Sequence, residues 1–174
     1  GNHVAIDAAP IPGANNDDAD AIDPTKSPHM AAVPPALPVR STFANWTGYE
    51  KGINGLIYEV QAPQAAITLL SSPFVFHNIG KLGTTVPAPG NLVTPSDLKT
   101  YAHPTLPGTT RVVITFANNS VLNTWLQVDV VTGVWGLAAE THFWGNARYD
   151  GGSVSGNYIL VNVTDKVDAL HNQY

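Results

Sequence analysis

Proline limits the folds open to this chain more than any other residue does. The stretch from Gly1 to Pro38 holds seven of the chain's 14 prolines, so helix is excluded there, because the proline ring removes a backbone N–H and clashes with the preceding turn. Within this stretch only Asn2 to Ile6 has the pattern of a short strand. We therefore divide the chain into an extended N-terminal arm, residues 1–38, and a folded domain, residues 39–174.

After Arg40 the sequence changes to short runs of β-branched and aromatic residues separated by Gly, Pro and Asn, which is typical of strands. Alternation within one run places Leu126, Val128 and Val130 on the core side. The continuous apolar runs 111–116 and 158–163 predict central strands, buried on both faces. Strands are expected near residues 40–47, 53–60, 74–79, 97–103, 110–117, 124–131, 138–146 and 157–164.

This many strands must form two sheets, because a single large sheet would leave its apolar face in water. Helix has room only between Asp165 and His171. The sequence therefore predicts an all-β fold, an antiparallel β-sandwich of jelly-roll type with a long proline-rich N-terminal arm.

Charge and cysteine content exclude several classes of protein. Charged residues make up 12% of the chain and the net charge is -5, so a nucleic-acid partner is not expected. No apolar run is long enough for a membrane span. Cysteine is absent, which leaves packing, hydrogen bonds and metal ions to stabilise the fold. A neutral polar surface of this kind favours an extracellular or cell-surface location.

Several segments in a fixed order carry a resemblance to a known family. They are residues 42–49 with 52–56, 74–76, 123–128, 136–139, 143–147 and 161–165, together with an Asn-Asp-Asp stretch near the N-terminus. In these the chain resembles a module common in large secreted proteins of planctomycete bacteria, often found beside dockerin-like calcium repeats. The resemblance implies a secreted β-sandwich and no defined activity. A long proline-rich stretch before Arg40 departs from the family pattern and favours a free-standing subunit.

An acidic cluster in the arm is the candidate metal site. Calcium prefers several hard oxygen ligands, and carboxylates gathered within nine residues could supply them, although the EF-hand glycine and terminal Glu are missing. A solvated acidic loop is the alternative interpretation. If the first and last strands are neighbours, a carboxylate near the C-terminus could share the ion. The candidate calcium ligands are Asp17, Asp18, Asp20, Asp23 and Asp165.

Aromatic side chains are the candidate ligand-binding residues. Exposed Trp and Tyr rings can cover the apolar faces of sugars, whereas buried rings belong to the core. We expect Trp125 to be buried or half-buried and Trp135, in a glycine-containing turn, to be the most exposed. The candidates for contact with a polysaccharide are Trp46, Tyr49, Trp135, Trp144 and Tyr149.

No catalytic motif is evident, and we expect no enzyme activity. The six histidines are dispersed, without the spacing of a zinc site, and no serine nucleophile elbow occurs. Structural or surface roles are expected for the histidines. A facing pair of carboxylates, as in glycosidases, is the alternative catalytic interpretation.

Two functions follow from these features. The first is a structural subunit that self-assembles into a fibre or surface layer by lending its arm to a neighbouring copy. Ile11, Met30, Val33 and Leu37 would pack on that copy, and a homo-polymer would result because such contacts do not close. The alternative is a carbohydrate-binding module of a secreted bacterial protein. The residues expected to pair with a neighbour are Asn2, His3, Val4, Ala5 and Ile6.

Overall fold

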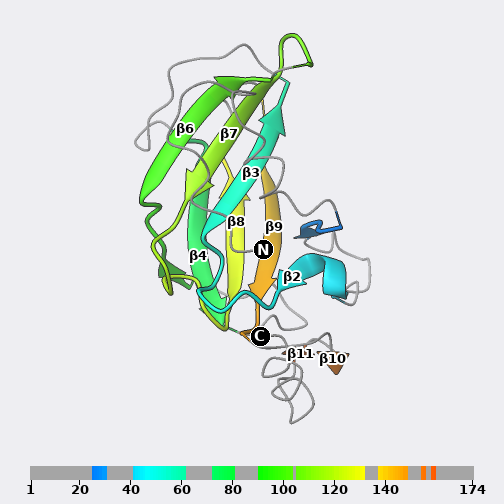
Figure 1. Cartoon of the computed structure of the whole chain (residues 1–174), viewed down its shortest axis with the longest axis vertical. Coiled ribbons are helices and arrows are strands. Elements are labelled where there is room, and N and C mark those ends of the chain that lie inside the picture. The colour runs from blue at the N-terminus through cyan, green and yellow to red at the C-terminus, as the bar shows by residue number, and fades with distance from the viewer. Residues whose placement is uncertain are drawn as a thin grey trace, which may run out of the picture.

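A computed structural model describes residues 25–30, 41–61, 72–80, 90–103, 105–131 and 137–148, and the backbone of 154–155 and 158–159. Its elements are strands and one 3-10 turn, η1 (Phe43–Asn45) (Figure 1). The strands are β1 (His29–Met30), β2 (Trp46–Thr47), β3 (Gly55–Val60), β4 (Phe74–Gly80), β5 (Asn91–Leu92), β6 (Asp97–Ala102), β7 (Thr110–Thr115), β8 (Trp125–Val130), β9 (Glu140–Asn146), β10 (Val154–Ser155) and β11 (Tyr158–Ile159).

Two sheets form the layers of a sandwich, which confirms the predicted all-β class (Figure 1). The larger sheet has the order β1-β9-β8-β4-β5, and β2 also pairs with β9. The smaller sheet has the order β3-β7-β6. The strand pairs are antiparallel except β2 with β9, which is parallel. β10 and β11 pair with each other in a separate sheet.

The strand order refines this class. β3-β7-β6 takes the places of strands B-E-D in an immunoglobulin-like sandwich, and β5-β4-β8-β9 takes the places of C′-C-F-G. The chain crosses between the layers from β3 to β4, from β5 to β6 and from β7 to β8. Within the sandwich class, this order is closer to the immunoglobulin-like arrangement than to a jelly roll.

The core lies between the two sheets and receives side chains from both. Val112 and Ile114 come from the smaller sheet, and Phe76, Leu126 and Val128 from the larger one. Alternation along β8 correctly predicts that Leu126, Val128 and Val130 face this core. Val113 on the opposite face of β7 is also buried, which confirms β7 as a central strand buried on both sides.

Most predicted strands are confirmed, with one local difference at residues 40–47. Only Trp46–Thr47 is strand there, and the preceding residues form η1. Asn45 explains the turn, because its Oδ1 accepts hydrogen bonds from the backbone N–H and the hydroxyl of Thr42. Of the last predicted strand, β11 covers Tyr158–Ile159 and the rest lies outside the described residues, as does 165–171.

Residues 25–30, which the sequence assigns to the arm, lie on the body of the same chain. β1 pairs with β9 at His29 and Met30. The N–H of Ser27 donates to the carbonyl of Ala44, and Asn45 Nδ2 donates to the carbonyl of Ser27. This part of the chain therefore belongs to the sandwich, and the body begins at or before residue 25.

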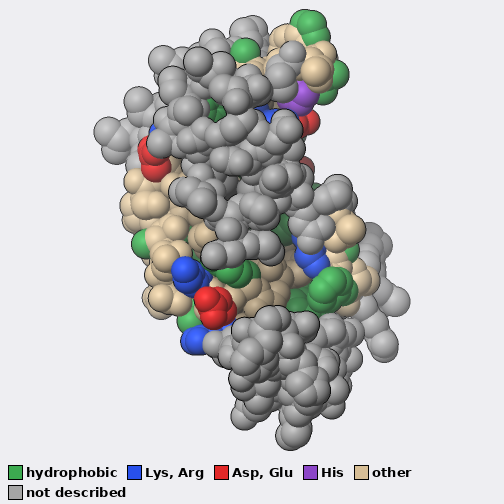
Figure 2. All heavy atoms as spheres, in the orientation of Figure 1, with side chains coloured by type: hydrophobic (Ala, Val, Ile, Leu, Met, Phe, Trp, Pro, Cys, Tyr) green, Lys and Arg blue, Asp and Glu red, His purple; other side chains and the backbone are tan. Residues whose placement is uncertain are grey.

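Charged side chains are few on the described surface. Figure 2 shows them singly or in small groups, separated by polar and apolar atoms. Among the described residues, no helix has the length and apolar character needed to cross a membrane.

Candidate functional site

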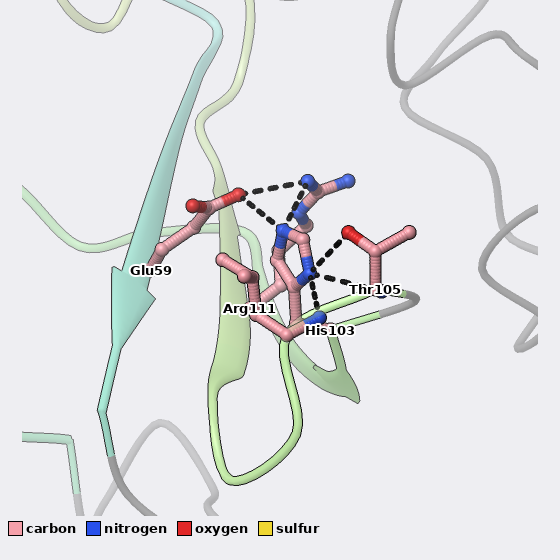
Figure 3. Close-up of polar contacts among 5 residues, drawn as sticks. Glu59, His103, Thr105 and Arg111 are labelled. Atoms are coloured by element: carbon pink, nitrogen blue, oxygen red, sulfur yellow. Dashed lines mark hydrogen bonds and ion pairs between the residues drawn. The ribbon is translucent and has the colours of Figure 1, made fainter.

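A compact polar cluster, Glu59, His103 and Arg111, lies on the outer face of the smaller sheet (Figure 3). Glu59 on β3 is directly opposite Arg111 on β7, and His103 follows β6. Glu59 Oε1 accepts hydrogen bonds from Arg111 Nη2 at 2.8 Å and from His103 Nε2 at 3.0 Å. The guanidinium of Arg111, and more weakly His103, lower the pKa of the Glu59 carboxyl.

The hydrogen bonds of His103 fix its tautomer. Its Nδ1 accepts from the backbone N–H groups of Thr105, at 3.2 Å, and Leu106, at 3.0 Å. Nδ1 therefore carries no proton, and Nε2 is the nitrogen that donates to Glu59. The Thr105 hydroxyl lies 3.5 Å from the same Nδ1, which gives a hydroxyl, an imidazole and a carboxylate in series.

This series resembles a nucleophile–base–acid triad, but its hydrogen bonds fit a structural role. The single lone pair of Nδ1 is already shared by two backbone N–H groups, so it cannot take the proton of the Thr105 hydroxyl. His103 instead links the β6–β7 connection to β3, through its hydrogen bonds with Thr105, Leu106 and Glu59.

A second chain of polar groups crosses the interior between the two sheets. The hydroxyl of Tyr58 on β3 lies 2.9 Å from Nε2 of His142 on β9, and His142 Nδ1 lies 2.9 Å from Glu140 Oε1. Burial raises the pKa of Tyr58, and it lowers the pKa of His142 against the opposing effect of Glu140. Because His142 is only 2% exposed, a substrate cannot reach this imidazole.

A third cluster, which we call the Asp129 cluster, consists of His77, Gln127, Asp129 and Thr141 on the outer face of the larger sheet. Asp129 Oδ1 accepts from the Thr141 hydroxyl at 2.7 Å, and Asp129 Oδ2 accepts from Gln127 Nε2 at 2.8 Å. His77 Nδ1 lies 3.4 Å from Asp129 Oδ2. Gln127 Oε1 is buried and has no hydrogen-bond partner among the described residues.

The free edge of β3 is the fourth feature. The N–H of Phe116 on the β7 side donates to the carbonyl of Asn54, so alternate residues from Leu56 onward direct their backbone groups to β7. The N–H and C=O groups of Gly55, Ile57 and Glu59 therefore point the other way. Within the described residues no strand pairs with that edge.

The outer edge of β6 differs from that of β3 in charge. Asp97 and Lys99 lie on β6 and form an ion pair of 3.3 Å, with both side chains substantially exposed. Charged side chains on an edge strand discourage pairing with another chain. On β3 the one charged residue, Glu59, is held by Arg111 and His103.

The aromatic residues expected to contact a sugar are largely withdrawn from the surface. Trp46 is 1% exposed and packs edge-on against Phe43, so it takes the core role. Trp144 is half-buried against the core, and Tyr49 is also half-buried. Trp125 is buried, as predicted. Trp135 and Tyr149 lie outside the described residues.

The predicted calcium ligands and pairing residues also lie outside the described part of the chain. These are Asp17, Asp18, Asp20, Asp23 and Asp165 for the metal, and Asn2 to Ile6 for assembly. In the part that the structure describes, no group of three or more His, Cys, Asp or Glu side chains is placed to hold a metal ion.

The local sequence does not reveal the three polar clusters, because each cluster joins residues from different strands. Glu59 and Arg111 are 52 residues apart, and Tyr58 and His142 are 84 apart. Alternation does place Gln127 and Asp129 on one face of β8, and this is the sequence signal for the Asp129 cluster.

Comparison with known proteins gives no relative: no family model matches the chain, nor does any curated protein or solved structure.

Proposed function

We propose that this protein is a non-catalytic extracellular structural subunit that self-assembles when its N-terminal arm adds a strand to β3 of a neighbouring copy. The free edge of β3 carries this proposal. In an immunoglobulin-like sandwich strand A lies next to strand B, and β3 has the position of strand B. Asn2 to Ile6, the strand expected within the arm, would fill the place of strand A.

The edge chemistry supports this assignment. An added strand would form backbone hydrogen bonds with Ile57 and Glu59, whose N–H and C=O groups point away from β7. Each such ladder bond offsets part of the cost of ordering the arm, which is about 1–2 kcal/mol per fixed backbone residue. A head-to-tail contact of this kind leads to a fibre or layer, since each copy offers both an arm and an edge.

In this proposal, calcium would bind the arm and restrict its motion. The acidic stretch Asp17 to Asp23 lies between the expected pairing strand and residue 25, from which the structure describes the body. An ion bound there, with Asp165 as a further ligand, would reduce the freedom of the arm before it meets a neighbour. The extracellular location is supported by the low content of charged residues and by the resemblance to secreted planctomycete modules.

A proline substitution on β3 tests the proposal. Ile57→Pro removes an N–H that points to the free edge and leaves the hydrogen bonds of β3 to β7 in place. We expect Ile57→Pro to remain folded but monomeric by light scattering, whereas Ile57→Ala, which keeps the N–H, assembles like the wild type. The proposal is wrong if Ile57→Pro assembles normally or if the wild type stays monomeric at every concentration.

Truncation provides an independent test with a boundary given by the fold. Deleting residues 1–24 removes the expected pairing strand and acidic stretch but keeps residues 25–30, which lie on β9 and η1. We expect the truncated protein to be a folded monomer, and an added peptide of residues 1–24 should bind to the free edge of its β3.

Carbohydrate binding is the alternative function. None of the candidate Trp and Tyr rings that the structure describes is broadly exposed, so this alternative now depends on Trp135 and Tyr149.

A further inference from the structure

The Asp129 cluster brings a hydroxyl and a carboxamide to one carboxylate. Thr141 on β9 lies directly opposite Asp129 on β8, and Gln127 precedes Asp129 by two residues on the same face of β8. The Thr141 hydroxyl donates to Oδ1 and the Gln127 amide donates to Oδ2. The hydroxyl oxygen and the amide group are thus each one hydrogen bond away from the same carboxylate.

The orientation of the Gln127 amide follows from its neighbour. An amide oxygen facing a carboxylate oxygen would be repelled, so the group that approaches Asp129 at 2.8 Å is the NH2. The amide oxygen then points elsewhere, and it is buried without a partner among the described residues. A buried acceptor of this kind is costly unless something donates to it.

We propose that this cluster forms an intramolecular ester between the Thr141 hydroxyl oxygen and the side-chain carbonyl carbon of Gln127, with release of ammonia. Asp129 is the general base, because it already holds the hydroxyl proton in a 2.7 Å hydrogen bond. This activity is independent of assembly and of the arm.

The reaction between Thr141 and Gln127 requires no other reactant. Thr141 Oγ1 attacks the Gln127 carbonyl carbon while its proton passes to Asp129, and the carbonyl oxygen becomes an oxyanion. Asp129 then returns the proton to the amide nitrogen, the C–N bond breaks, and ammonia leaves as the carbonyl re-forms. The products are one ester and one ammonia, and the Asp129 carboxylate is regenerated.

Two further features of the cluster suit this reaction. Gln127 is 6% exposed, so water has poor access to the carbonyl carbon, and an ester formed there would be protected from hydrolysis. His77 is opposite Gln127 on β4, and its Nδ1 is buried without a hydrogen bond to the described residues. Its Nδ1 lies 3.4 Å from Asp129 Oδ2, so the ring covers the carboxylate that acts as the base.

The ester would give the chain a covalent link that it otherwise lacks. The chain contains no cysteine and so no disulfide. A bond between residues 127 and 141 would close the β8–β9 hairpin and reduce the freedom of its unfolded state, as a disulfide does in the chain-entropy account.

Intact-mass measurement of the purified full chain tests the proposal directly. We expect the wild type to be lighter than its sequence by one ammonia. Trypsin leaves Gln127 and Thr141 in one peptide, residues 112–148, because no Lys or Arg lies between them. A protease that cleaves at Trp135, between the two linked residues, is therefore required. The fragments carrying Gln127 and Thr141 should remain joined until hydroxylamine separates them and leaves a hydroxamate on residue 127.

Matched variants exclude other sources of ammonia loss. Succinimide formation at Asn54–Gly55 also releases ammonia, but it does not depend on the cluster. Thr141→Val and Asp129→Asn should restore the full mass, whereas Thr115→Val, a threonine on the smaller sheet, should not. A wild-type mass equal to the sequence mass, or an ammonia loss that persists in Thr141→Val, would overturn the proposal.

Discussion

Tyr58 and His142 join the two sheets by one hydrogen bond, with the tyrosine hydroxyl 2.9 Å from the imidazole Nε2. Tyr58 belongs to the smaller sheet and His142 to the larger one. The Tyr58 ring also stacks on Phe74, with ring centroids 4.6 Å apart. A polar contact inside the core therefore fixes how the layers meet, because an alternative packing would leave both groups unpaired.

Removing this hydroxyl should destabilise the fold. Tyr58→Phe keeps the ring and its stacking but leaves His142 Nε2 buried without its partner. We expect the free energy of unfolding to fall by about 1–3 kcal/mol, measured by urea denaturation. Tyr49→Phe is the control, since that ring is half-buried and its hydroxyl forms no hydrogen bond with the described residues. Equal stability of the two variants would argue against the role of the Tyr58 hydroxyl.

Stability should decrease as the pH falls through the histidine range. Burial lowers the pKa of both His142 and His29 below the ordinary value of 6.5, with opposing contributions from Glu140 and Asn45. Below that value the unfolded chain binds protons that the folded chain resists, so protonation favours unfolding. Urea midpoints measured from about pH 8 to about pH 5 should decline, and His142→Gln should reduce the decline. A constant midpoint would contradict the pKa directions.

His103 should control the order of the β6–β7 connection. Replacing His103 with Ala removes the acceptor for the N–H groups of Thr105 and Leu106, and we expect these two amides to exchange faster with deuterium. The loss in unfolding free energy should be about 0.5–1.5 kcal/mol. Glu59→Gln weakens the ion pair but keeps both N–H bonds, so exchange at Thr105 and Leu106 should change less.

Alanine substitution at two glycines with positive φ should destabilise the fold to different extents. Gly52 has φ +86° and Gly108 has φ +77°, so alanine is strained at both positions. At Gly108 the added Cβ would meet open space, and we expect a cost of about 1–2 kcal/mol. At Gly52 the Cβ would collide with the carbonyl of Val121, so the midpoint of unfolding should fall further. Similar midpoints would show that the chain around Val121 yields easily.

The long strands of this sandwich follow from local sequence, and the short ones do not. β7 and β8 have runs of β-branched or alternating apolar residues whose burial depends little on their partners. β1, β5 and β10 are two residues long, and pairing with a neighbouring strand defines them. Register information of that kind is absent from a local pattern.

The polar clusters illustrate a second limit of sequence reasoning. His103 and Glu59 are unremarkable in their local context, and they meet because β3 and β6 both pair with β7. The aromatic residues show the same limit, since the sequence around Trp46 gives no sign that Thr47 pairs with Asn146 and draws the indole inside. Contacts between distant segments require the strand order, which composition and periodicity do not supply.

The parallel pairing of β2 with β9 has a mechanical consequence. Tension that pulls on the N-terminal end of β2 and on the C-terminal end of β9 would act at opposite ends of the pair. The hydrogen bonds between them would then be loaded together in shear rather than opened one after another. Asn146 Nδ2 and the N–H of Ala147 both donate to the carbonyl of Thr47, adding bonds that carry the same load. A tensile force that reaches β2 and β9 is therefore resisted by several hydrogen bonds at the same time.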